Sequence, residues 1–221
     1  MSSKPRLWTK GFILDTLVNF LIYIIYYMLM VIIASEAIHS LHASMSEAGL
    51  ASGIFILGTL VARLFAGRSV ELYGRRKMLF AGILFYLATT FMYFGIHSMA
   101  MLYLVRCLNG IGYGIASTAT STIVSTMIPA ERRGEGINYY ALSMSLAAAI
   151  GPFIGMLMQQ IFPFEDIIYF CIAMIVVCLG AAAVMHVEEM ELTEEHRAAL
   201  KEIHIANFLE PKVTAISIVA F

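Results

Sequence analysis

Long uninterrupted apolar runs, separated by short polar segments, dominate the chain. Six runs are long enough for a helix to cross the roughly 30 Å hydrocarbon layer of a bilayer, which takes about 20 residues. These runs are Phe12–Ala34, Ser46–Ala66, Met78–Ile96, Ala100–Met127, Asn138–Phe162 and Ile167–Met185. Because they are continuous rather than alternating, they predict membrane-spanning helices and not the strands of a β-barrel.

The composition supports this interpretation and excludes several classes of function. Hydrophobic residues make up 60% of the 221 residues and charged residues 13%, whereas soluble domains average about 45–50% and about 25%. The net charge of -1 gives no reason to expect a nucleic-acid partner, and three cysteines cannot form a disulfide scaffold. Motifs of the CxxC, HExxH and GxSxG types are absent. We therefore expect an all-α membrane protein that is not an enzyme and needs no metal or cofactor.

The loop charges predict the orientation of the bundle. Cations lie before the first run, between runs two and three, between runs four and five, and after run six, and none lies in the other loops. The positive-inside rule places such loops in the cytoplasm. The sequence therefore predicts a multi-pass protein of the cell (plasma) membrane, surrounded by lipid, with both ends of the bundle cytoplasmic. The loop cations are Lys4, Arg6, Lys10, Arg68, Arg75, Arg76, Lys77, Arg132, Arg133, Arg197, Lys201 and Lys212.

The composition changes after the sixth run and divides the chain into three parts. Residues 1–186 form the predicted six-helix bundle. Residues 187–212 are rich in glutamate, and Thr193 followed by Glu194 and Glu195 is typical of a helix start. We predict a cytoplasmic acidic helical linker here. Residues 213–221 are apolar again but too few to span a bilayer, so they are interpreted as the start of a truncated seventh helix.

The segment between runs two and three reads Gly67-Arg-Ser-Val-Glu71-Leu-Tyr-Gly74-Arg75-Arg76-Lys77. It resembles the loop signature Gly-x-x-x-Asp-Arg-x-Gly-Arg-Arg of the major facilitator superfamily. Glu71 replaces the acidic residue of that signature, and a leucine replaces the first basic one. Glycines permit a tight turn, and a carboxylate at a helix end can bind cations of a neighbouring bundle. We interpret this segment as a conformational hinge loop; the alternative is that its cations only anchor the topology.

Two further segments resemble signatures of the same superfamily, in the same order. In the fourth run, Arg106-Cys-Leu-Asn109-Gly110-Ile-Gly112 is similar to Arg-x-x-Gln-Gly-x-Gly. In the fifth run, Gly151-Pro152-Phe-Ile-Gly155 is similar to the end of the signature of its antiporters. Together with Ala147, these glycines recur every four residues and predict a small-residue face for close helix packing.

This resemblance implies a fold and an activity. The chain is expected to be the N-terminal six-helix half of a twelve-helix transporter, built from two three-helix inverted repeats. The implied activity is secondary active transport by alternating access, with proton-coupled efflux of small amphipathic or drug-like solutes. The implied partners are the small-molecule substrate, protons and a C-terminal six-helix half outside this chain. The alternative is a truncated or structural six-helix membrane subunit that does not transport.

Three charged residues inside the predicted spans are candidates for proton coupling. They are Asp15, Arg63 and Arg106, because charges in lipid are costly and are usually functional. Asp15 and Arg63 are expected at similar depth near the inner face, where we predict an ion pair or a water-bridged contact. This pair could tune a proton site or could only orient the first two helices.

One face of the first run carries aromatic rings with polar tips. Asn19, Tyr23 and Tyr27 follow each other at steps of four, so they share a helix face. Such a face suits a cavity for amphipathic substrates, and these residues are the substrate-cavity candidates. The alternative is that they pack between helices.

Overall fold

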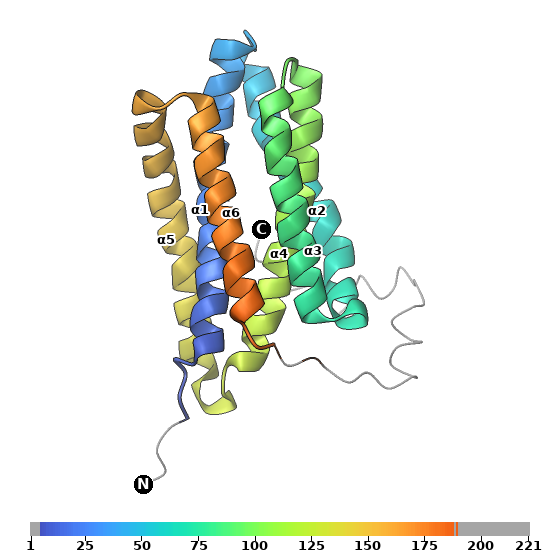
Figure 1. The fold of residues 1–221 in the computed structure, drawn as a ribbon, viewed down its shortest axis with the longest axis vertical. Coiled ribbons are helices and arrows are strands. Elements are labelled where there is room, and N and C mark those ends of the chain that lie inside the picture. Colours follow the sequence, from blue (N-terminus) through green and yellow to red (C-terminus); the bar gives the residue numbers. More distant parts are fainter. Residues whose placement is uncertain (1–4, 188, 190–221) are drawn as a thin grey trace, which may run out of the picture. The chain divides into compact units, whose positions relative to one another are not determined.

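The computed structural model describes residues 5–187 and 189, and all regular structure in this part is helical. Figure 1 shows the six long helices as one bundle. Each of them is long and apolar enough to cross a membrane, as predicted. They are α1 (Lys10–Ser40), α2 (Met45–Tyr73), α3 (Arg75–Phe91), α4 (Met99–Met127), α5 (Arg133–Ile161) and α6 (Phe164–Val184), with short 3-10 turns η1 (Met92–Gly95) and η2 (Ala130–Arg132).

Three helices extend at least five residues beyond one end of the apolar runs that predicted them. α1 ends at Ser40 rather than Ala34, α2 ends at Tyr73 rather than Ala66, and α5 begins at Arg133. The apolar run marks the part of a helix that crosses lipid, whereas backbone hydrogen bonds continue through polar residues. The predicted linker at 187–212 and seventh helix at 213–221 lie outside the described residues, except for Val187 and Glu189 at the start of the linker, which lie outside any helix.

Short polar caps begin several helices. The Thr9 side chain accepts a hydrogen bond from the backbone N–H of Phe12, and Ser98 does the same at the start of α4. At α2, Ser44 and Glu47 form a reciprocal capping box. These bonds satisfy backbone donors that a helix start leaves without an intrahelical partner.

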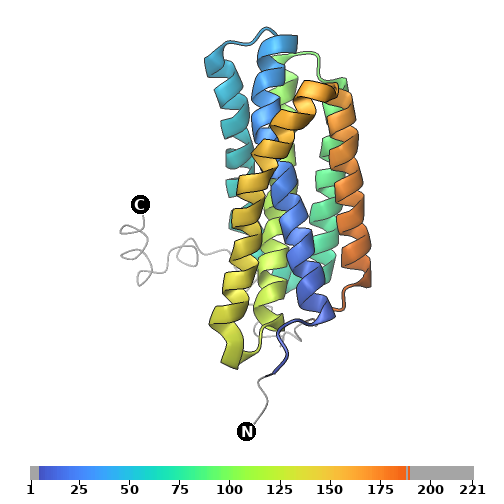
Figure 2. The same cartoon turned by 90° about the vertical axis from the view of Figure 1, so that its left-hand side faces the viewer.

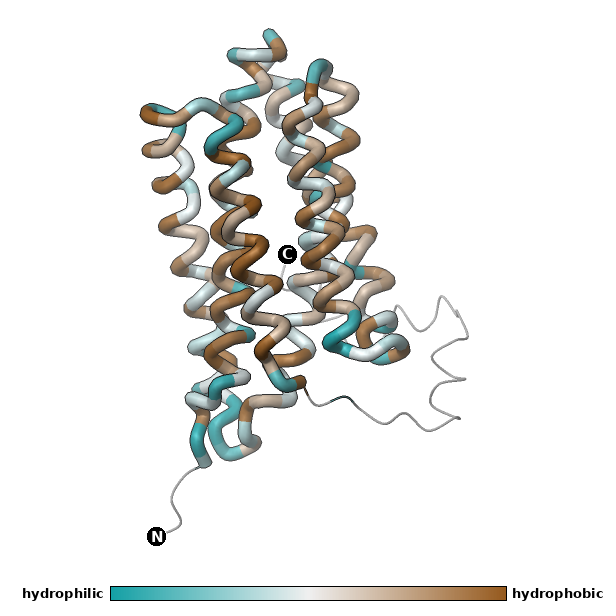
Figure 3. The backbone as a smooth tube through the Cα atoms, in the orientation of Figure 1, coloured by the Kyte–Doolittle hydropathy of each residue, from teal (hydrophilic) through white to brown (hydrophobic). Residues whose placement is uncertain are grey.

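The charges within the described residues divide the bundle into two ends. We call the end where α1, α3 and α5 begin the basic end, because it carries Lys10, Arg75, Arg76 and Arg133; it is the lower end in Figure 1. At the opposite end, the terminal turns of the helices and the described segments between them contain acidic and histidine side chains but neither Lys nor Arg. Figure 3 shows predominantly hydrophobic colours along the helices between these ends.

The helix contacts follow the pattern of two inverted three-helix repeats. α1 packs against α5 and α6, and α4 packs correspondingly against α2 and α3. Two further contacts, α1 with α4 and α3 with α6, each join equivalent helices of the two repeats. Exchanging α1–α3 with α4–α6 therefore preserves these contacts. Figures 1 and 2 show α5 alongside α1 and α3 alongside α4.

Small residues let the central helices approach closely. A Cβ atom added to Gly112 would lie 2.7 Å from the backbone nitrogen of Tyr86, so α3 contacts α4 through its main chain. Gly110 meets the backbone of Phe55 on α2 in the same way. On α5, Gly151 and Gly155 face the side chains and backbone of α1, which is the close packing that the small-residue face predicts.

Gly112→Ala should destabilise the bundle, because the added methyl group forces two helix backbones apart. Overpacking of this kind costs about 1–3 kcal/mol, and we expect a lower melting temperature of the purified protein in detergent. Gly53→Ala is the matched control, because its Cβ would meet no atom within 4 Å and alanine favours helix by roughly 0.5–1 kcal/mol. Equal melting temperatures for the two variants would contradict the close α3–α4 contact.

Candidate functional site

A pocket of about 430 Å³ lies on the face shared by α1, α2, α4 and α5. Its volume falls within the range of small-molecule sites, about 300–1,000 Å³. α3 and α6 contribute nothing to its lining. We call it the Arg63 pocket, and its lining residues are Tyr23, Arg63, Ser117, Thr118, Ser121, Tyr140 and Met144.

Arg63 is the charged residue of this pocket. Its side chain is exposed, and no described residue forms a hydrogen bond or an ion pair with it. It lies about 15 Å from the end of α2 at Tyr73, at 1.5 Å per residue. A guanidinium is thus presented to the pocket from within the apolar part of a helix.

The predicted Asp15–Arg63 ion pair is wrong. The Asp15 side chain is fully buried, and neither of its carboxyl oxygens has a hydrogen-bond partner among the described residues. Because α2 continues to Tyr73 rather than ending at Ala66, Arg63 lies deeper than the apolar run suggested. Asp15 lies only about 8 Å from the start of α1. The two charges are therefore at different depths.

A buried polar network lies one turn from Asp15 and joins α1, α4 and α5. Asn19 donates from Nδ2 to Ser143 Oγ at 3.1 Å, and its Oδ1 lies 2.9 Å from the Tyr140 hydroxyl. Thr120 Oγ1 lies 3.0 Å from that same hydroxyl. Asn19 is therefore held behind the pocket, whereas Tyr140 connects the network to the pocket lining.

Aromatic rings extend from the Arg63 pocket towards the centre of the bundle. Tyr23 lines the pocket, and its ring centroid lies 5.4 Å from that of Tyr113 and 6.4 Å from that of Tyr27. Tyr26 stacks on Phe55 at 5.0 Å. Two of the three cavity candidates, Tyr23 and Tyr27, therefore belong to this cluster. Tyr113 and Phe55 were missed because they come from other helices, and no spacing within one helix signals that they meet.

Arg106 is buried where α4 meets α2 and η1, the turn that follows α3. Its Nε donates to the Ala51 carbonyl at 3.2 Å and its Nη1 to the Tyr93 hydroxyl at 3.3 Å. Its guanidinium carbon lies 4.4 Å from the centre of the Phe55 ring, a cation–π contact. Nη2 has no hydrogen-bond partner. Asn109, one turn further, donates to the hydroxyls of Thr89 and Thr90, both at 3.1 Å.

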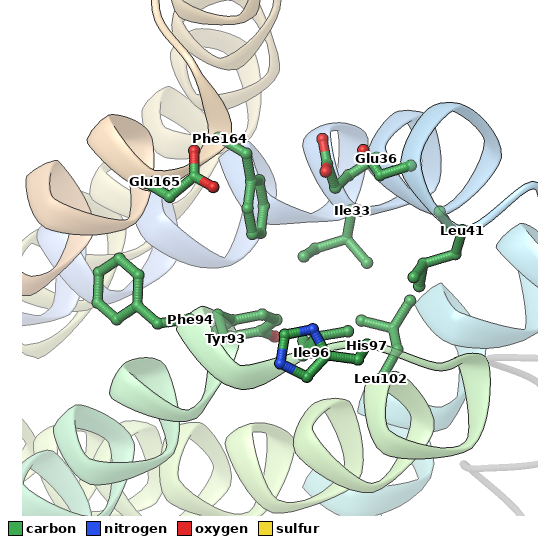
Figure 4. A pocket seen from close by; sticks show the side chains of 12 residues that line it. Ile33, Glu36, Leu41, Tyr93, Phe94, Ile96, His97, Leu102, Phe164 and Glu165 are labelled. Atoms are coloured by element: carbon green, nitrogen blue, oxygen red, sulfur yellow. The ribbon is translucent and has the colours of Figure 1, made fainter.

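A second pocket, of about 270 Å³, lies at the end opposite the basic end, between α1, η1, α4 and α6. Figure 4 shows Glu36 and Glu165 on one side of it, with Tyr93 and His97 across from them. We call it the Glu36 pocket. It contains two carboxylates and no lysine or arginine, so its charge is opposite to that of the Arg63 pocket. Through Tyr93 it adjoins the Arg106 network.

The turn between α2 and α3 is shorter than the segment that the hinge-loop signature covers. Gly67 and Glu71 belong to α2, and the turn between α2 and α3 consists of Gly74 alone, with φ +97° and ψ 140°. Gly67 is therefore not part of a turn, which corrects the expectation for that glycine. Gly74 adopts a backbone conformation that is essentially restricted to glycine. Glu71 is exposed, and no described residue pairs with it.

A different carboxylate binds the start of α3. Glu189, beyond α6, accepts hydrogen bonds from the backbone N–H groups of Arg75 at 2.8 Å and Arg76 at 3.0 Å. The Arg76 side chain donates to the carbonyl of Ala183 at 2.9 Å. A carboxylate at a helix N-terminus is favourable because of the free donors and the helix dipole. Glu189 was missed because it stands among several glutamates that the sequence alone does not distinguish.

Comparisons with known proteins agree with this architecture. The sequence profile of the Major Facilitator Superfamily matches residues 16–220. Multidrug resistance protein 2 of Bacillus subtilis is 23% identical over 184 residues, which cover 82% of this chain and 46% of the relative. An MFS-type transporter of Methanocaldococcus jannaschii is 28% identical over 132 residues, covering 60% of this chain and 34% of the relative.

A solved structure has the same fold. The crystal structure of a mutant of the peptide transporter POT superposes with a TM-score of 0.72 and 17% identity, over 95% of this chain and 46% of that chain. The chain thus spans about half the length of this structure, and less than half of the two curated relatives.

Glu189→Ala should loosen the start of α3, because two backbone N–H groups lose their acceptor. A hydrogen bond contributes about 1 kcal/mol, so we expect amide exchange at Arg75 and Arg76 to become about fivefold faster. Hydrogen–deuterium exchange with mass spectrometry in detergent measures this. Glu71→Ala removes a nearby carboxylate that binds no described residue and should leave the exchange unchanged. Equal exchange in both variants would contradict the Glu189 contact.

Proposed function

The chain belongs to the Major Facilitator Superfamily, and we propose that it forms one half of a proton-coupled exporter of small amphipathic or drug-like solutes. Proteins of this superfamily are multi-pass membrane transporters of small molecules, a class distinct from enzymes. The observation that carries the proposal is the Arg63 pocket, which lies where α1, α2, α4 and α5 share one face. Export rather than import is supported by relatives such as Multidrug resistance protein 2.

Alternating access requires a second six-helix half against which this bundle can rock. Large apolar side chains are exposed on α2 and α5, the helices that flank the pocket, and they suit contact with such a half or with lipid. They include Leu60, Leu64, Phe65, Leu142, Leu146 and Phe153. The proposed substrate site then lies between the halves, with Tyr23 and Tyr27 on its wall and Asn19 supporting it.

The hinge residues are proposed to connect the two conformations of the transport cycle. Gly74 allows the sharp connection between α2 and α3, and Arg75 and Arg76 lie at the helix start that Glu189 binds. Glu71 is exposed at the same end and available to cations of the other half. In the proposed orientation, this basic end faces the cytoplasm of a cell whose plasma membrane the protein spans.

Asp15 is proposed to carry the transported proton. An ionised carboxylate that is buried without partners is very costly, so the neutral acid fits the site that the structure describes. Rocking of the halves would expose the carboxyl to water and release its proton. Arg63 can then stabilise the carboxylate only if the helices move, because the two side chains do not pair in this conformation. Arg106 is proposed to support coupling by fixing α4 to α2 and to η1.

Asp15→Asn should abolish transport that a pH gradient drives, because an amide cannot carry the proton. Exchange of labelled for unlabelled substrate across the membrane should remain, since this exchange needs no net proton movement. Both are measured with the intact native polypeptide in proteoliposomes, with and without an imposed pH gradient. Glu131→Gln, an exposed acid at the basic end, is the matched control and should retain both activities.

Two results would contradict this proposal. Gradient-driven flux that survives in the Asp15→Asn variant would remove Asp15 from coupling. No flux and no exchange for any solute with the unmodified protein would favour the alternative, a six-helix membrane subunit that does not transport. The intact mass of the native polypeptide shows whether the second half is part of the same chain.

A further inference from the structure

We propose that the Arg63 pocket selects aromatic organic anions, a substrate class that rests on the transport function proposed above. Three features of the described residues favour such ligands: the charge of the pocket, the lack of an acidic partner for that charge, and the aromatic rings beside it.

The charge of the pocket is positive and uncompensated. Arg63 has no ion-pair partner among the described residues, and the other six lining side chains are uncharged. A cation within the apolar part of a membrane helix is stable only where a partner or water reaches it. A guanidinium presents several N–H donors in a plane that matches the oxygens of carboxylate, sulfonate or phosphate groups. An oxyanion is therefore the complementary ligand group.

Among the described residues, no acidic side chain lines the Arg63 pocket. Asp15 on α1 is fully buried, does not line the pocket and forms no ion pair with Arg63. An organic cation in the pocket would face a like charge without a carboxylate to balance it, which disfavours its binding.

The hydroxyl groups of α4 make Arg63 the main donor. Ser117 and Thr118 donate to the carbonyl of Gly114 at 3.3 and 2.7 Å. Ser121 donates to the carbonyl of Thr118 at 2.9 Å. Because each hydroxyl is bonded to the helix backbone in this structure, these groups are weaker competitors than Arg63 for an oxyanion.

The aromatic cluster accounts for the preference for a ligand with an aromatic body. Tyr23 lines the pocket, and from it the rings of Tyr113, Tyr26 and Tyr27 follow with centroid distances of 5.4, 5.1 and 4.7 Å between successive rings. Aromatic rings favour offset or edge contacts with other rings at such distances. A ligand with an oxyanion on Arg63 can therefore place an aromatic body against Tyr23. Met144 provides a polarisable contact on the opposite helix of the pocket.

A probe series with one ring system and different charges tests this inference. Naphthalenesulfonate, naphthylmethanol and naphthyl-trimethylammonium share the aromatic body and keep a fixed charge at all working pH values. Equilibrium dialysis with the intact native polypeptide in detergent gives their dissociation constants. We expect the sulfonate to bind at least about tenfold more tightly than the alcohol, as for one hydrogen bond to a charged group, and the ammonium to bind most weakly.

Variants of Arg63 separate its charge from its shape. Arg63→Gln should reduce the preference for sulfonate over alcohol by about tenfold, and Arg63→Lys should retain part of it because the charge remains. Arg133→Gln is the matched control, an exposed arginine at the start of α5 outside the pocket, and should leave the ratio unchanged. Because the Arg63 side chain is exposed, we expect its variants to fold, and melting curves check this.

The inference and the transport proposal fail in different ways. Equal or tighter binding of the ammonium, no binding of any probe, or an unchanged ratio in Arg63→Gln would overturn the anion preference. Gradient-driven flux of the ammonium but not of the sulfonate would overturn it too. Sulfonate binding that depends on Arg63, without flux of either charged probe, would support the preference and contradict the transport function.

Discussion

The burial of Arg106 constrains how α2, α3 and α4 pack. A guanidinium away from water must find hydrogen-bond partners within the protein, and here the Ala51 carbonyl, the Tyr93 hydroxyl and the Phe55 ring supply them. Ala51 and Phe55 lie on α2, which α4 approaches through Gly110, and Tyr93 lies in η1, directly after α3, which α4 approaches through Gly112. The close packing of these helices and the hydrogen bonding of the Arg106 guanidinium therefore depend on each other.

The two intramembrane arginines differ in what surrounds them. Arg106 is enclosed by the protein, whereas Arg63 faces a pocket in which no described residue pairs with it. Arginine is well suited to both roles, because it stays charged and offers donors in several directions. The enclosed arginine stabilises the first three-helix repeat against α4. The open one is available to a ligand.

Two buried polar networks of the bundle both include α4. The Asn19 network joins α1 to α4 and α5, and the Asn109 network joins α4 to α3. In lipid, each polar side chain that is bonded inside the protein fixes a helix pair. Asp15 differs, because it lies beside the first network without bonding to it. An unbonded carboxyl at a joint between repeats can respond to their movement, whereas a bonded one would resist it.

The sequence by itself determined the class of fold. Six apolar runs of sufficient length imply six helices, because no other structure satisfies its own backbone in lipid, and three signatures in order indicate the superfamily that the family profile confirms. The sequence also identified the small-residue face of α5, since steps of four place its members on one side of a helix.

Only the tertiary structure decided which side chains meet. Depth estimated from apolar runs placed Asp15 and Arg63 together, but α2 continues well beyond its run and the two lie apart. Glu189, rather than Glu71, binds the start of α3, and Tyr113 and Phe55 join the rings of α1 from other helices. Periodicity assigns a residue to a face of its own helix. The rotation and axial position of one helix against another depend on packing between distant segments, which no local pattern contains.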